Sequence, residues 1–177
     1  MTSSYAYVPA DDPLFGTITV ELDHAAGRLV VDGDAIPRVD VRRAAAAPVD
    51  AQVPIGTRAP EALALAVGGT PVALRPAKGF LTRRSYRVDA GEGGAGYAHR
   101  LVPVSLGTSR LLHDGVPLGE FTSTGDGQVT AEWRAAGTGA RPEAYDAAVG
   151  YALAAAFGTG AEPMWKLALD AALELWP

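Results

Sequence analysis

GTITVELDHAAGRLVVD, residues 16–32, alternates apolar and polar side chains on either side of a short turn. Ile18, Val20 and Leu22 fall on one face of an extended chain, because successive side chains of a strand point to opposite faces. The AAG turn at residues 25–27 reverses the chain, and the apolar run RLVVD returns after it. The stretch therefore predicts an antiparallel β-hairpin.

Short segments of this kind continue along the chain as far as residue 134. Turn signals separate them, most clearly the Asp-Gly pairs at residues 32–33, 114–115 and 126–127, since glycine accepts the positive φ of tight hairpin turns. About ten strands at such regular spacing favour an antiparallel β-barrel or a sandwich built as a meander. Beyond the first hairpin, strands are expected at residues 38–43, 62–67, 71–74, 81–89, 97–104, 109–113, 116–122 and 128–134.

The hydrophobic period changes after residue 141. Two Gly-Thr-Gly-Ala segments each lead into a proline, at Pro142 and Pro163, and proline is favoured at the first position of a helix. We therefore expect a C-terminal helical hairpin, with helices at residues 142–157 and 163–175. The first helix carries no charge after Asp146, which predicts burial on all sides, whereas the second is amphipathic. The expected fold class is mostly β with added helix (α+β).

Length and composition bound the class of protein. With 177 residues, one domain is expected, at residues 15–177, with its β meander at 15–134 and a flexible arm at 1–14. The chain has no cysteine, so disulfides and thiolate chemistry are excluded. The N-terminus lacks the pattern of a signal peptide, and no apolar run reaches the roughly 20 residues of a transmembrane helix. A cytoplasmic protein is therefore expected.

The charge balance bears on partners. The net charge is −5, which argues against nucleic acid as a partner, because the phosphate backbone repels an acidic surface. Arginine greatly outnumbers lysine and asparagine is absent, a composition typical of genomes with high G+C content. In this respect the chain is similar to actinobacterial proteins of unknown function.

Several strand units of the chain share a pattern of aromatic and apolar residues with Asp-Gly turns. These are SYRVD at residues 85–89, YAHRL at 97–101 and SRLLHDGVPLGEF at 109–121. They resemble the repeating strand units of the tubby-like superfamily, which includes LURP-one-related proteins and phospholipid scramblases. The resemblance covers residues 15–157 and implies a closed antiparallel barrel threaded by an apolar helix. The second helix departs from that plan, and none of the superfamily's binding motifs is matched.

A basic cluster stands out in this acidic chain. On a strand, Arg83 and Arg87 share one face, while Arg84 and Tyr86 share the other. Guanidinium groups bind phosphate or carboxylate with two parallel hydrogen bonds, so one interpretation is a site for a small anionic ligand. The other is a solvated edge strand whose charges discourage aggregation. The candidate ligand-binding residues are Arg75, Arg83, Arg84, Tyr86, Arg87 and His113, with Lys78 in the same cluster.

No motif predicts a catalytic residue, a metal ligand or a cofactor. Residues 91–96 match G-x-G-x-x-G, but a strand is expected after them, where dinucleotide binding requires a helix N-terminus. His99 and His113 fall on strands expected to be neighbours, and Asp114 adjoins one of them. An acid–base pair is one interpretation, and ordinary surface or half-buried histidines are the other.

The second expected helix offers a candidate interaction surface at Met164, Trp165, Leu169 and Trp176. These side chains either pack on the strands of the same chain or form a face for a partner protein or a homo-dimer. The leading hypothesis is a non-catalytic cytoplasmic β protein that binds a partner protein or a small anionic ligand. Two alternatives stay open: a small-molecule enzyme with a His/Asp/Tyr acid–base site, and a structural homo-oligomer assembled through residues 163–176.

Overall fold

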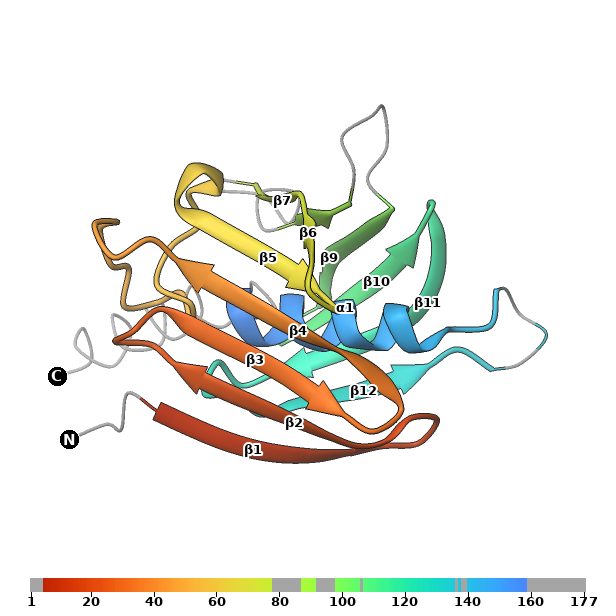
Figure 1. Ribbon diagram of the computed structural model, residues 1–177. Coiled ribbons are helices and arrows are strands. Elements are labelled where there is room, and N and C mark those ends of the chain that lie inside the picture. The colour runs from red at the N-terminus through yellow and green to blue at the C-terminus, as the bar shows by residue number, and fades with distance from the viewer. Residues whose placement is uncertain are drawn as a thin grey trace, which may run out of the picture.

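The computed structural model describes residues 5–77, 87–91, 98–105, 107–135, 137 and 140–158. Within these ranges the chain forms two six-stranded antiparallel sheets with one α-helix between them (Figure 1). Each strand pairs with the next strand along the chain, so each sheet is a meander. In this part of the chain no ladder joins one sheet to the other, and the arrangement is sandwich-like rather than a closed barrel. The predicted mostly β, antiparallel class is confirmed.

The first sheet contains the hairpin with which the sequence pattern began. Ile18, Val20 and Leu22 all face the core, as their alternation predicts. A short 3-10 helix, η1 (Pro60–Ala62), leads into the fifth strand. In spatial order the strands are β1 (Tyr5–Asp12), β2 (Gly16–Asp23), β3 (Arg28–Gly33), β4 (Ile36–Arg43), β5 (Leu63–Val67) and β6 (Thr70–Val72).

The second sheet begins one residue after the first one ends. Only Ala73 separates β6 from the next strand, so the single strand expected at residues 71–74 is wrong: its two ends belong to different sheets. The strands of the second sheet are β7 (Leu74–Pro76), β8 (Val88–Ala90), β9 (His99–Ser105), β10 (Thr108–His113), β11 (Val116–Ser123) and β12 (Val129–Trp133). Residues 81–86, expected in a strand, lie outside the described part.

The helix α1 (Ala144–Phe157) is buried on all sides, as its lack of charge predicts. It contacts strands of both sheets, which explains why it shows no polar face. Glu143 and Asp146 form a capping box at its N-terminus, so the helix begins two residues after the expected Pro142. The second expected helix, residues 163–175, lies outside the described residues.

The N-terminal segment is a strand, which corrects the expectation of a flexible arm at residues 1–14. Residues 5–12 pair with β2 along their whole length as β1. Pro9 and the exposed Tyr5 and Tyr7 concealed the alternation, but proline is tolerated on an edge strand, where its missing N–H breaks no ladder. Among the described residues β1 pairs with β2 alone and is such an edge.

Two of the three Asp-Gly signals behave differently from one another. Asp114 and Gly115 have φ angles of 48° and 80° and form the tight turn between β10 and β11, as predicted. Gly33 instead ends β3, and the turn before β4 falls on residues 34–35. The difference arises because the β3–β4 register shifts between Val31 and Gly33.

A buried arginine ties the end of β4 to the loop that follows it. The side chain of Arg43 donates from Nη1 to the carbonyl of Ile55 at 3.1 Å and from Nη2 to that of Ala25 at 3.0 Å. Ile55 in turn donates its N–H to Ala156 near the end of α1, at 2.9 Å. The last carbonyls of a helix have no hydrogen-bond partner within the helix, and this loop supplies a donor to one of them.

Gly56→Ala tests how tightly this arginine is held. Gly56 has a φ of 92°, and an added Cβ would overlap the guanidinium group of Arg43. We expect a loss of about 2–3 kcal/mol in the free energy of unfolding, measured by urea denaturation, from backbone strain and displacement of the arginine. Gly69→Ala is the matched control, because Gly69 also has a positive φ (82°) but has no neighbour within 4 Å of the added Cβ. If both variants lost the same free energy of unfolding, backbone strain alone would explain the effect, without displacement of Arg43.

Candidate functional site

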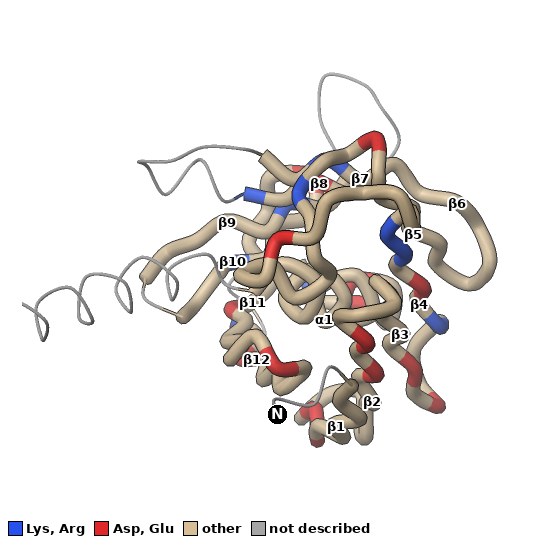
Figure 2. The backbone as a smooth tube through the Cα atoms, turned by 90° about the vertical axis from the view of Figure 1, so that its left-hand side faces the viewer, with Lys and Arg blue, Asp and Glu red and all other residues tan. Residues whose placement is uncertain are grey.

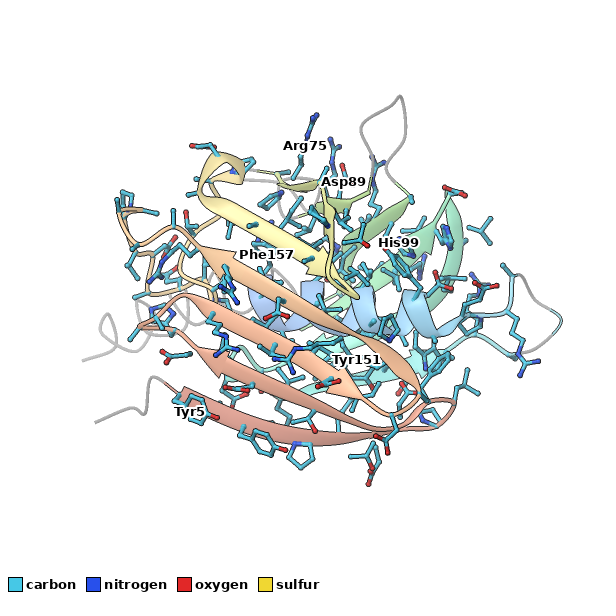
Figure 3. All side chains as sticks on the ribbon, viewed as in Figure 1. Tyr5, Arg75, Asp89, His99, Tyr151 and Phe157 are labelled. Carbon is cyan, nitrogen blue, oxygen red and sulfur yellow. The ribbon has the colours of Figure 1, made fainter. Side chains whose placement is uncertain are left out.

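Two histidines from neighbouring strands meet inside the protein. His99 at the start of β9 is directly opposite His113 at the end of β10, on the sheet face that points toward α1. Their rings stack with centroids 4.3 Å apart. His99 is buried, whereas 38% of the His113 side chain is exposed. The expectation that these residues lie on adjacent strands is therefore correct, and Figure 3 places His99 between the second sheet and α1.

Both histidines contact one carboxylate at the start of the central helix. Asp146 Oδ1 lies 2.7 Å from His99 Nε2 and 2.8 Å from His113 Nδ1. The other oxygen, Oδ2, accepts the backbone N–H of Glu143 at 2.7 Å, as part of the helix cap. One buried aspartate thus joins the helix N-terminus to two strands of the second sheet.

The environment keeps Asp146 ionised. Burial by itself would raise its pKa, because desolvation disfavours the charged form. The hydrogen bonds from His99 and from the Glu143 N–H outweigh that effect, and the imidazole charges add to them, so the pKa of Asp146 lies below its ordinary value. The cluster therefore combines a buried carboxylate with two imidazoles, groups that serve either in proton transfer or as metal ligands.

Sequence reasoning identified the more distant acidic partner of these histidines and not the nearer one, Asp146. Asp114, the expected partner, has a side chain that is 78% exposed and lies 3.7 Å from His113 Nε2. Asp146 was missed because it is distant along the chain. The signal was present, however: a charge at the start of a helix expected to be fully buried must have a partner. Tyr86, the expected aromatic member, lies outside the described residues.

A second cluster lies on the opposite face of the same sheet. Arg75 on β7, Asp89 on β8 and Arg100 on β9 form a row of directly opposed residues across three strands. Arg100 donates to both oxygens of Asp89, at 2.5 and 3.3 Å, and Arg87 Nε lies 3.6 Å from the same carboxylate. Figure 3 shows Arg75 and Asp89 on the side of the sheet away from α1. We call Arg75, Arg87, Asp89 and Arg100 the arginine cluster.

Two guanidinium groups of the arginine cluster share one carboxylate. Asp89 is buried and contacts both Arg87 and Arg100, whose side chains are 44% and 41% exposed. The pKa of Arg100 lies above its ordinary value, chiefly because of its hydrogen bond to Asp89. In Figure 2 several basic residues lie along β7, β8 and β9, while the protein as a whole is acidic, with a net charge of −5.

The arginine cluster overlaps only in part with the sequence prediction. Arg75 and Arg87 lie in it, but His113 does not, since it faces the other side of the sheet. Arg100 was missed, although its position next to the inward-facing His99 places it on the outer face by alternation. Lys78, Arg83 and Arg84 lie outside the described residues, as do Met164, Trp165, Leu169 and Trp176.

A third polar cluster is centred on the buried carboxylate of Asp12 and is structural. The carboxylate accepts hydrogen bonds from the Tyr151 hydroxyl at 2.9 Å and from Trp133 Nε1 at 2.9 Å. The backbone N–H groups of Leu14 and Phe15 complete its shell, at 2.8 and 3.0 Å. Burial raises the pKa of Tyr151 above its ordinary range, so its hydroxyl stays protonated and donates. With every contact directed inward, this cluster joins β1 to β12 and α1.

Comparison of the chain with family models, with curated proteins and with solved structures found no match. The tubby-like resemblance therefore stays a prediction. In the described part of the chain, no helix is long and apolar enough to cross a bilayer.

Proposed function

We propose that this chain is a non-catalytic cytoplasmic protein that binds a small anionic ligand, through a phosphate or carboxylate group, at the arginine cluster. The observation that supports this most directly is that two partly exposed arginines, Arg87 and Arg100, contact one buried aspartate, Asp89. A guanidinium fork matches the geometry of both anions and keeps its charge at all physiological pH values.

The surroundings of the cluster favour binding over simple charge pairing. Asp89 binds Arg100 through two hydrogen bonds and so holds that guanidinium group in a defined orientation. Arg75 and Arg100 project from paired strands, which give a more precise placement than loops would. Across the same sheet face, Arg110 and Glu120 show the ordinary alternative, a one-to-one ion pair at 2.7 Å.

Phosphate and citrate titrations of the full chain test this proposal. Calorimetry at low ionic strength should show saturable binding, which the double variant Arg75→Gln with Arg87→Gln weakens by on the order of 10-fold or more. Arg110→Gln is the matched control, since the Arg110 side chain is as exposed as that of Arg100 (41%) but is paired with its own glutamate. Binding that is absent, or that the control variant weakens equally, would refute the arginine cluster as the site.

A second candidate function, a small-molecule enzyme, is favoured by the 2.7 Å contact between His99 and Asp146. A His–Asp pair of this length is a common acid–base arrangement. It stays second because an enzyme also needs a cavity for its substrate beside the reactive groups. One hollow lies on the outer face of the first sheet, over β1 to β4, and another on that of the second, over β10 to β12, and neither of these two is lined by His99 or His113.

The partner-protein form of the hypothesis rests on residues outside the described part of the chain. Met164, Trp165, Leu169 and Trp176 still present an apolar pattern that would suit a partner protein or a homo-dimer. Measuring the mass of the protein in solution at micromolar concentration distinguishes a homo-dimer from a surface for a partner protein, because a monomer excludes the homo-oligomer.

A further inference from the structure

The histidine cluster has more hydrogen-bonding groups than a helix anchor requires. One imidazole contact at Asp146 Oδ1 would be enough to anchor the helix cap, in which Oδ2 accepts the Glu143 N–H. Instead two stacked rings direct His99 Nε2 and His113 Nδ1 at the same oxygen. The structure thus brings three potential ligand atoms, from two strands and one helix, within 4.8 Å of one another.

We propose that His99, His113 and Asp146 bind one divalent transition-metal ion, and that Zn²⁺ is the ion that fits best. Zinc takes imidazole nitrogen and carboxylate oxygen at about 2.0–2.2 Å in tetrahedral geometry, which places ligand atoms about 3.4 Å apart. The contacts of 2.7 and 2.8 Å to Asp146 Oδ1 are hydrogen-bond distances. Side-chain rotation would have to lengthen both to about 3.4 Å and bring the two imidazole nitrogens, which lie within 4.8 Å of one another, to a similar separation.

The proton balance of this exchange is simple. Metal binding requires His99 Nε2 and His113 Nδ1, the nitrogens that face Asp146, to be free of their protons. Each ring can carry one proton on its other nitrogen, and any further proton is released to water. For His113 that nitrogen is Nε2, which faces the Asp114 carboxylate at 3.7 Å. A carboxylate behind a ligating histidine is a recurrent feature that orients the ring.

Charge and access suit a cation at this place. Glu143 and Asp146 put two carboxylates at the N-terminus of α1, and they offset the positive end of the helix dipole. Asp146 and His99 are buried, so the site is held rigidly, while the partly exposed His113 provides the entry route. Three protein ligands leave one tetrahedral position for water or for a donor group of a small ligand.

The site is independent of the arginine cluster and of the function proposed for it. His99 and Arg100 are consecutive residues that project to opposite faces of β9, one toward α1 and the other toward Asp89. Metal binding and anion binding can therefore succeed or fail separately.

Titration of the full chain, without a polyhistidine tag and after treatment with a chelator, tests the metal site. Competition with a chromophoric chelator should give one Zn²⁺ per chain, and Co²⁺ should show the visible absorption of a tetrahedral site. We expect His99→Gln and His113→Gln each to weaken Zn²⁺ binding by about 100-fold or more, and Asp114→Asn by about 10-fold. Zn²⁺ should also raise the Tm of the wild type but not that of His113→Gln.

His24→Gln is the matched control. It removes the one other histidine of the chain, whose Nδ1 lies 2.9 Å from the Pro54 carbonyl, away from the cluster. Zn²⁺ binding should be unchanged in this variant. Because His113 is partly exposed, the His113→Gln variant should remain folded even if His99→Gln does not. Circular dichroism measures whether each variant is folded. If the wild type does not bind Zn²⁺, or if His113→Gln binds it as tightly as the wild type, the cluster is only a hydrogen-bonded helix anchor and the proposal is wrong.

Discussion

Replacing Asp12 by alanine is expected to lower the free energy of unfolding by about 3–5 kcal/mol, because it removes the charged acceptor of four hydrogen bonds at once. The change leaves four donors without their acceptor: Tyr151 Oη, Trp133 Nε1 and two backbone N–H groups. Each buried donor left unpaired costs about 1–3 kcal/mol before relaxation. Urea denaturation followed by tryptophan fluorescence measures the loss.

The neighbouring residue provides the control for this variant. Asp11 lies on the same strand but is exposed, and it accepts one hydrogen bond, from Thr17. Asp11→Ala should therefore change the free energy of unfolding by no more than about 0.5 kcal/mol. Tyr151→Phe, which removes a single donor, should cost about 1–2 kcal/mol. If Asp12→Ala were as mild as Asp11→Ala, Asp12 would not join β1 to the rest of the core.

The second large effect is expected where the ring of Phe121 packs on the backbone of α1. Phe121 is fully buried, and its ring makes edge-to-face contacts with Trp133 at 5.4 Å and with Tyr151 at 5.4 Å. Phe121→Ala should cost about 3–5 kcal/mol, because it leaves a cavity between β11 and the helix. Thermal or chemical denaturation gives the value.

Gly150 makes this contact testable in both directions. A Cβ added there would lie 2.9 Å from Phe121 Cε1 and closer still to Cζ, so Gly150→Ala should cost about 1–3 kcal/mol. In the Phe121→Ala background the same change should become neutral or stabilising, since alanine favours the helix by about 1 kcal/mol and its methyl group fills part of the cavity. A double-mutant cycle measures this coupling. Additive losses would mean that the ring and the glycine do not share one packing constraint.

The two proposed sites differ in how visible they were in the sequence. The arginine cluster was partly predictable, because Arg75 and Arg87 lie close together along the chain and are unusual in an acidic protein. The histidine cluster was not, since the neighbours of His99 and His113 in sequence pointed to Asp114 rather than Asp146. The contact between His99 and Asp146 spans 47 residues, and no spacing rule connects a strand to a helix cap.

Local pattern was sufficient for the class of the fold. Period-two alternation through Ile18, Val20 and Leu22 specified a strand with one buried face, because the pleat directs alternate side chains to opposite faces. The pair Asp114–Gly115 specified a hairpin because its positive φ angles suit the turn. The uncharged run of α1 specified a buried helix, since no face could meet water.

The rest of the fold was determined by contacts between residues that lie far apart in the sequence. The Asp12 contacts with Trp133 and Tyr151 span 121 and 139 residues, so β1 was mistaken for a flexible arm even though it completes the first sheet. The same holds for the division of residues 70–76 between two sheets and for the meeting of both histidines with Asp146. Which strand faces the helix, and at which residue, depends on how all the layers pack together. A window of a few neighbouring residues carries no information about that packing.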